Sequence, residues 1–310
     1  MLTPATRAAI YHNSHMKIYP DGGCVLLVAD RSIFREAGWE ERRRRKPLHA
    51  ADEEGADIVC ECEAAAGEEQ PAGEEQIAGE AEAVTADTSR ARRRARSAIF
   101  DLARCNDFKY FVTFTLDETK VDRYDVGAIT LKLNNWLDNN VRRRGLKYVL
   151  VPELHKDGAV HFHGLINDAL PVTDSGTIIT GTGRPRRPRR PRSLAERQKW
   201  LAGGGHVVYN VAAWSLGFST AIELYGDPGR AIGYVCKYIS KTTGKVGGRW
   251  YYSGGALARP LVAVFETDFA AAAATASAKF TLEGLGSECC RIEFESMEDF
   301  DNARESLGIR

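Results

Sequence analysis

The sequence predicts an α+β protein whose sheet is mainly antiparallel and is flanked by helices. Runs of β-branched and aromatic residues, such as 110–116 (YFVTFTL), are typical of strands. Residues 122–144 repeat their apolar side chains with the period of a helix. Two apolar runs, 147–154 and 159–166, are separated only by residues 156–158 (KDG), which predicts a tight hairpin and therefore antiparallel pairing.

The formal net charge of zero conceals three segments of different charge. Residues 1–87 carry 9 basic and 18 acidic side chains, residues 88–266 carry 29 and 15, and residues 267–310 carry 4 and 9. The middle segment, at +14, is expected to bind a polyanion, and its acidic flanks either aid solubility or mask the basic surface. No apolar run approaches the ~20 residues of a membrane span. The 7 cysteines are scattered without a CxxC pair, which predicts a reducing, cytoplasmic location and excludes a disulfide scaffold.

Composition also divides the chain into regions. Residues 1–49 are expected to form a small strand pair followed by a basic segment. Residues 50–88 form an acidic low-complexity linker, which is predicted to be disordered or loosely helical because it has little apolar surface to bury. The main domain is expected at 89–266, beginning with a helix at 91–105. Residues 267–310 are expected to be an acidic tail or a small appendage.

The rest of the main domain contains one unusual segment. We expect a long loop at 168–200, strands at 206–211 and 217–224, and a helix at 227–241. The loop carries RPRRPRRPR at 184–192, whose alternating prolines keep it extended. Its arginines are predicted to follow a DNA backbone, unless the segment is a solvated insertion without contacts. They are Arg184, Arg186, Arg187, Arg189, Arg190 and Arg192.

A histidine pair is the sharpest local signal. His161 and His163 are two residues apart in a predicted strand, so both imidazoles project from one face while Phe162 points into the core. Two histidines on one face can supply half of a divalent metal site, although an HxH pair alone is more often structural.

The hairpin adds a carboxylate to this pair. With a three-residue loop, Glu153 lies opposite His161, whereas a two-residue loop would turn Glu153 to the other face. Glu153, His161 and His163 would then form an open site for Mg²⁺ or Mn²⁺, with zinc as a further candidate. His155 shares the face of Glu153 but lies at the hairpin tip, and is a second-rank ligand. The alternative for Glu153 is an ordinary exposed strand end.

A second signal lies at 234–241 (YVCKYISK). In a helix, Tyr234 and Tyr238 lie on one face, and Lys237 and Lys241 lie beside them. A tyrosine hydroxyl can attack a phosphodiester if a metal polarises the phosphate and a cation favours the phenolate. In the alternative interpretation, the tyrosines pack the helix on the sheet and the lysines only extend into solvent.

Together, YFVTFTLD at 110–117, HFH at 161–163 and YVCKYISK resemble the three motifs of rolling-circle replication initiators, the HUH endonucleases, in their order. The resemblance is greatest to initiators of small single-stranded DNA phages and related plasmids, and it covers residues 90–265. It implies a sheet that presents His161 and His163 as metal ligands, with Glu153 as the acidic ligand and Tyr234 and Tyr238 as nucleophiles. The acidic linker and the arginine-rich loop depart from the family pattern.

The resemblance implies a metal-dependent DNA endonuclease and strand transferase in a bacterial host cytoplasm. Such an enzyme nicks and rejoins single-stranded or locally melted origin DNA, forming a 5′-phosphotyrosyl link and leaving a 3′-OH primer. The chain has no GxxxxGK[ST] motif, so a host helicase and polymerase are expected partners. A plasmid relaxase, a transposase and a non-catalytic DNA-binding protein are the alternatives.

Overall fold

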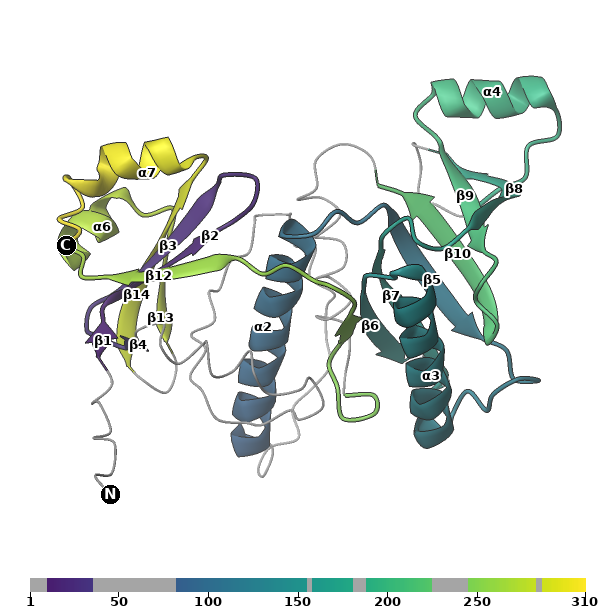
Figure 1. Ribbon diagram of the computed structural model, residues 1–310, viewed down its shortest axis with the longest axis horizontal. Coiled ribbons are helices and arrows are strands. Elements are labelled where there is room, and N and C mark those ends of the chain that lie inside the picture. The colour runs from purple at the N-terminus through teal and green to yellow at the C-terminus, as the bar shows by residue number, and fades with distance from the viewer. Residues whose placement is uncertain (1–9, 36–81, 155–157, 181–187, 225–244, 283–285) are drawn as a thin grey trace. The chain divides into compact units, whose positions relative to one another are not determined.

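The structure is a computed structural model that describes residues 10–35, 82–154, 158–180, 188–224, 245–282 and 286–310. The chain divides into two compact units, one formed by residues 95–258 and the other by residues 1–94 together with 259–310. Figure 1 shows the elements of both units. Within the described residues, no helix is both long enough and apolar enough to cross a membrane.

The first unit, residues 95–258, contains a seven-stranded sheet in the order β11-β6-β7-β5-β10-β9-β8. All neighbouring strands are antiparallel, which confirms the predicted fold class. The strands are β5 (Tyr110–Leu116), β6 (Tyr148–Leu154), β7 (Val160–Ile166), β8 (Val172–Ile179), β9 (His206–Val211), β10 (Gly217–Glu223) and β11 (Tyr252–Gly254).

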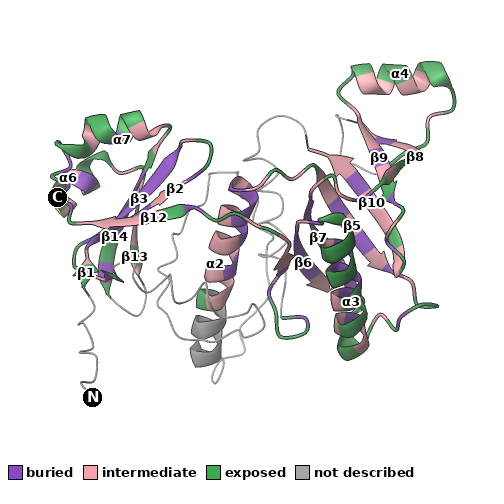
Figure 2. Ribbon diagram, viewed as in Figure 1, coloured by how far each residue is buried: buried purple, intermediate pink, exposed green. Residues whose placement is uncertain are grey.

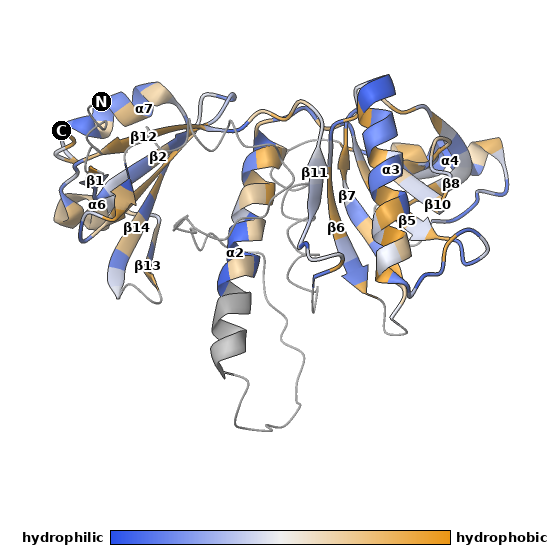
Figure 3. Ribbon diagram, turned by 60° about the horizontal axis from the view of Figure 1, so that its bottom comes forward, coloured by the Kyte–Doolittle hydropathy of each residue, from blue (hydrophilic) through white to orange (hydrophobic). Residues whose placement is uncertain are grey.

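Helix α3 (Val126–Arg144) covers one face of this sheet (Figure 1). It begins at Asp125, whose side chain accepts a hydrogen bond from the backbone N–H of Ala128. Its apolar stripe packs with Phe114 of β5 and Phe162 of β7, and the strands it covers are largely buried (Figure 2). Figure 3 shows that α3 carries hydrophilic as well as hydrophobic residues, as expected of a helix with one solvated side. Because side chains alternate along a strand, the intervening residues of β5 and β7 project from the opposite face.

The β6–β7 hairpin has the predicted register. Glu153 lies opposite His161, and Val151 lies opposite His163. Gly158 has a φ of +86°, as expected for the last residue of a three-residue hairpin loop. Glu153 and His161 therefore share one face of the sheet, as the sequence predicted.

The segment 168–200 is not one long loop. It contains strand β8, which pairs with β9, and helix α4 (Leu194–Ala202). Ser193 caps α4 by accepting a hydrogen bond from the backbone N–H of Glu196. Arg189 forms an antiparallel bridge with Ile178, so the basic segment returns alongside β8. The prediction was wrong because β8 lies at the sheet edge and is interrupted by a bulge between Asp174 and Thr177, which obscures its alternation.

The second unit contains a five-stranded antiparallel sheet in the order β12-β2-β3-β14-β13. Its strands come from both ends of the chain: β2 (Ser14–Ile18) and β3 (Cys24–Ala29), and then β12 (Leu261–Phe265), β13 (Ala278–Leu282) and β14 (Ser287–Phe294). Helices α6 (Phe269–Thr275) and α7 (Met297–Arg304) contribute Ala272 and Phe300 to the core beside β3 and β14. Strands β1 (Tyr11–His12) and β4 (Phe34–Arg35) form a separate pair.

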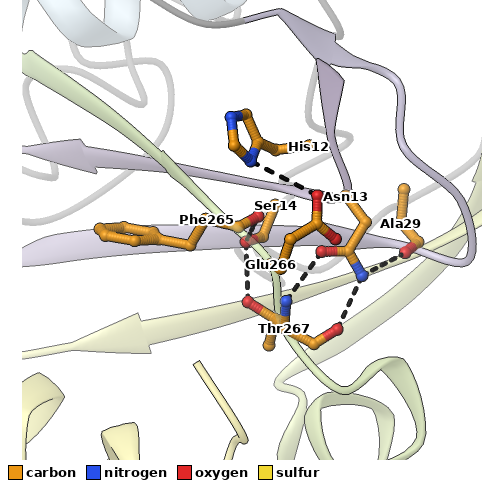
Figure 4. A network of polar contacts seen from close by, with 7 residues as sticks. All are labelled: His12, Asn13, Ser14, Ala29, Phe265, Glu266 and Thr267. Atoms are coloured by element: carbon orange, nitrogen blue, oxygen red, sulfur yellow. Dashed lines mark hydrogen bonds and ion pairs between the residues drawn. The ribbon is translucent and has the colours of Figure 1, made fainter. Parts of the chain in front are cut away.

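A buried polar network joins the two ends of the chain (Figure 4). The side-chain amide of Asn13 donates to the backbone oxygen of Thr267 at 2.7 Å, and its oxygen accepts from the Thr267 N–H at 2.8 Å. The hydroxyl of Ser14 lies 2.7 Å from the Thr267 hydroxyl. These paired buried groups tie the segment before β2 to the segment after β12, since leaving any of them unpaired would cost folding free energy.

The division of the chain differs from the sequence-based one. The regions 1–49 and 267–310, which we treated separately, contribute strands to one sheet. Residues 50–81 of the acidic linker lie outside the described residues, and its end forms the start of helix α2 (Glu82–Arg104). The strand pair predicted near the N-terminus is confirmed by β2 and β3.

Candidate metal and nucleic-acid site

The histidine pair and Glu153 lie on the sheet face opposite α3. Neighbouring strands β6, β7 and β5 place Glu153, His161 and Thr115 side by side, since each is the direct partner of the next. The adjacent row contains His163 and Thr113, which are also partners. Phe162, between the histidines, is fully buried, as predicted. The structure therefore brings the three predicted metal ligands together.

Each imidazole makes a defined polar contact. Nε2 of His163 lies 2.7 Å from Oε2 of Glu153. Nδ1 of His163 lies 3.0 Å from the Thr113 hydroxyl, and Nδ1 of His161 lies 3.1 Å from the Thr115 hydroxyl. A threonine hydroxyl can donate or accept, so it accommodates either imidazole tautomer. His163 is buried, at 8% exposure, and its ring stacks on Phe111 with 6.2 Å between the centroids.

These residues fit a divalent metal in the chemistry of their donors. Two imidazole nitrogens and one carboxylate oxygen suit Mn²⁺ or Mg²⁺, with open positions for substrate. Metal-binding histidines commonly have the other ring nitrogen held by a hydrogen bond, which is what Thr113 and Thr115 supply at Nδ1. Within the described residues, no cluster of three or more His, Cys, Asp or Glu side chains has metal-binding geometry. His155 lies outside them, and the metal remains a prediction.

The predicted tyrosine helix lies outside the described residues. Tyr234, Lys237, Tyr238 and Lys241 all fall in the segment 225–244. Among the described tyrosines, burial raises the pKa of Tyr148 to about 12 and also raises the pKa of Tyr252. Both pack in the core on the α3 side of the sheet. Their phenols resist ionisation and are poorly placed to serve as nucleophiles.

The arginine-rich segment is described only in part. Arg189, Arg190 and Arg192 belong to the described residues, and the bridge to Ile178 anchors Arg189 beside β8. Arg189 and Arg190 are exposed. Arg184, Arg186 and Arg187 lie outside the described residues. The exposed guanidinium groups can reach a polyanion without any rearrangement of the core.

The sequence analysis did not single out three residues that border this site. Thr113 and Thr115 contact the histidines, and their spacing of two in a predicted strand was the available signal. Phe218 of β10 is the direct partner of Thr115 on the same sheet face and is 70% exposed. Phe218 also fell in a predicted strand, but its neighbours depend on which strands pair.

The first unit is thus an α+β domain with an imidazole pair and a carboxylate on one sheet face and exposed arginines near its edge. Residues 109–243 match the family model of the ORF2-type replication-associated proteins. The matched segment is less than half of the chain, and it contains Glu153, both histidines and both predicted nucleophilic tyrosines. The match supports a replication initiator protein that acts on DNA. No curated protein and no solved structure matches the chain.

Proposed function

We propose that this protein initiates rolling-circle replication by nicking and rejoining single-stranded origin DNA, as an endonuclease of the HUH superfamily. The observation that carries the proposal is the gathering of Glu153, His161 and His163 on one sheet face within the segment that matches replication-associated proteins. A phage or plasmid origin is the substrate we expect. A relaxase or transposase of the same superfamily would share this site.

The residues of the chain divide the work. Glu153, His161 and His163 would hold Mg²⁺ or Mn²⁺, which when bound supplies positive charge to polarise the scissile phosphate. Thr113 and Thr115 hold both imidazoles through Nδ1, so that Nε2 is the nitrogen available to a ligand. Lys237 and Lys241 are proposed to favour the phenolate form of the nucleophilic tyrosine.

The proposed reaction exchanges one phosphoester bond for another. The hydroxyl oxygen of Tyr234 or Tyr238 attacks the scissile phosphorus and loses its proton. The bond from phosphorus to the 3′ oxygen breaks, and this oxygen takes up a proton to become a free 3′-OH. The 5′ side remains attached as a phosphotyrosine, and the reverse attack by a 3′-OH rejoins the strand. Positioning and charge stabilisation provide the catalysis.

The free 3′-OH would prime a host polymerase, and a host helicase would separate the strands. Both partners, and a cytoplasmic location, are part of the proposal and follow from the chemistry of the product.

A covalent-adduct assay tests the proposed function. We expect the full-length protein, mixed with random-sequence single-stranded DNA and Mn²⁺, to form an adduct that survives denaturation and is attached at a 5′ end. EDTA should reduce the adduct to background, and sequencing of the attached strands should return one preferred site. Adduct formation at the same rate in EDTA would contradict the metal-dependent mechanism. No adduct with either metal would leave DNA binding without catalysis, and a preferred site that is a transfer origin or a transposon end would identify a relaxase or transposase.

We also propose that the segment 184–192 contacts the DNA backbone without sequence preference. Replacing its six arginines with glutamine should weaken binding to all single-stranded sequences. The slope of log affinity against log salt should fall by roughly 0.7 for each phosphate that the protein no longer neutralises. The matched control replaces Arg142, Arg143 and Arg144 at the end of α3, and should change the slope less. An unchanged slope in the 184–192 variant would make this segment a solvated insertion.

A further inference from the structure

A row of side chains crosses the sheet through the candidate metal site and ends on an exposed aromatic ring. Glu153, His161, Thr115 and Phe218 are successive partners on β6, β7, β5 and β10. Partners in an antiparallel sheet project from the same face, so Phe218 stands on the face of the histidines. Two strand spacings, or roughly 10 Å, separate the backbones of Phe218 and His161.

The backbone beside Phe218 is held firmly. A Cβ atom at Gly217 would collide with the Thr115 carbonyl oxygen, so only glycine permits this close approach of β10 to β5. The same carbonyl accepts a hydrogen bond of 3.2 Å from the indole N–H of Trp214. Trp214 is itself buried and stacks on Phe114 with 4.4 Å between the ring centroids. The main chain that carries Phe218 is therefore anchored by the sheet and by a buried aromatic pair.

The ring of Phe218 nevertheless is not used for packing. It is 70% exposed, whereas Phe114 and Phe162 on the other face are fully buried. A large aromatic side chain that is rigidly mounted and exposed beside a polar site is a cost to solubility unless it has a partner.

We propose that Phe218 is a stacking platform for an unpaired base of the single-stranded DNA that lies next to the scissile phosphate. This inference rests on the proposed function and names how the strand is positioned in the site. Aromatic side chains stack on bases of any sequence, and such platforms work together with a basic surface that attracts the backbone. Residues 88–266, which contain Phe218, carry 29 basic and 15 acidic side chains, so the charge of this region suits such a strand. Stacking at Phe218 would fix the strand in register, with its neighbouring phosphate beside His161.

The test is a binding measurement that does not depend on catalysis. Affinity for a single-stranded oligonucleotide containing the preferred cleavage site, or for oligothymidine if no site is found, is measured by fluorescence anisotropy in EDTA. Phe218→Ala should weaken binding roughly tenfold, within the range of stacking contributions. Phe218→Trp should restore binding, and Phe218→Leu should not, because leucine keeps an apolar side chain without an aromatic face. The matched control is Leu131→Ala, which removes a side chain that is 64% exposed on α3 and should leave affinity unchanged.

Abasic substitution locates the contact. Removing single bases in turn should reveal one position at which wild-type protein loses affinity but Phe218→Ala loses no more. Equal affinity of wild type and Phe218→Ala, or full binding by Phe218→Leu, would overturn the inference while leaving the nicking assay untouched. A shift from dimer to monomer in Phe218→Ala with unchanged DNA affinity would instead assign the ring to contact between copies of the chain. Absence of nicking by the wild type would count against the proposed function without changing these binding results.

Discussion

Replacing His161 or His163 with alanine is expected to reduce nicking about a thousandfold or more while leaving affinity for single-stranded DNA nearly unchanged. Each imidazole is proposed to supply one metal ligand, and polarisation of a phosphate by a bound metal contributes several kcal/mol to catalysis. DNA affinity should persist because it depends mainly on phosphate contacts by arginine and lysine. Mn²⁺ titration, the rate of adduct formation, and DNA binding in EDTA measure the three effects separately.

Controls for this experiment come from the same sheet. His206→Ala alters a histidine on β9, away from the row of candidate ligands, and should preserve Mn²⁺ affinity. Glu153→Ala should weaken Mn²⁺ binding more than DNA binding, since it removes the carboxylate that contacts His163. Unchanged Mn²⁺ affinity in both histidine variants would remove the metal site from this face of the sheet.

The threonines provide a graded version of the same result. Thr113→Val and Thr115→Val keep the side-chain shape but remove the hydroxyl that contacts Nδ1 of each histidine. Loss of such a supporting hydrogen bond typically weakens metal affinity about 10- to 100-fold. The serine variants retain a hydroxyl and should recover Mn²⁺ affinity. If the valine variants bind Mn²⁺ as well as wild type, these hydroxyls do not position the ligands.

Replacing both Tyr234 and Tyr238 with phenylalanine is expected to abolish the covalent DNA adduct. If the two hydroxyls alternate, each single variant should retain one round of cleavage. If only one acts, we expect it to be Tyr234, because Lys237 follows it by three residues and is farther than Lys241 from the predicted helix end near Gly244. Peptide mapping of the adduct from each single variant distinguishes these cases.

Removal of only the phenolic oxygen makes Tyr→Phe the mildest available change, and DNA binding in EDTA checks that each variant is folded. An adduct that persists in the double variant would exclude both tyrosines as nucleophiles. Tyr124, whose side chain is exposed, would then be the next residue to replace. The buried Tyr148 and Tyr252 remain poor candidates, since burial raises the pKa of both phenols.

The accuracy of the sequence-based predictions followed the range of the interactions involved. The β6–β7 hairpin was predictable because residues 156–158 set its loop length, and the loop length sets which residue faces His161. Helix α4 had a readable signal that we did not use, since Ser193 precedes Glu196 by the spacing of a helix cap. Strand β8 had no such signal, because its Asp, Ser and Gly residues have low strand propensity and it is formed only by pairing with β9.

Pairings between distant segments were outside the reach of local patterns. Strand β12 pairs with β2 across most of the chain, and Asn13 forms its hydrogen bonds with Thr267. Neither partner has a pattern that identifies the other, so the two ends were treated as separate regions. Only the folded chain reveals that they share a core.

By itself, the sequence determined that Glu153, His161 and His163 share one face, because a short hairpin and strand alternation fix their relation within a few residues. The tertiary structure alone decided that Thr113 and Thr115 hold the two imidazoles and that Phe218 stands at the end of the same row. Those neighbours depend on β5 lying between β7 and β10, an order that is set by burial of the whole sheet against α3.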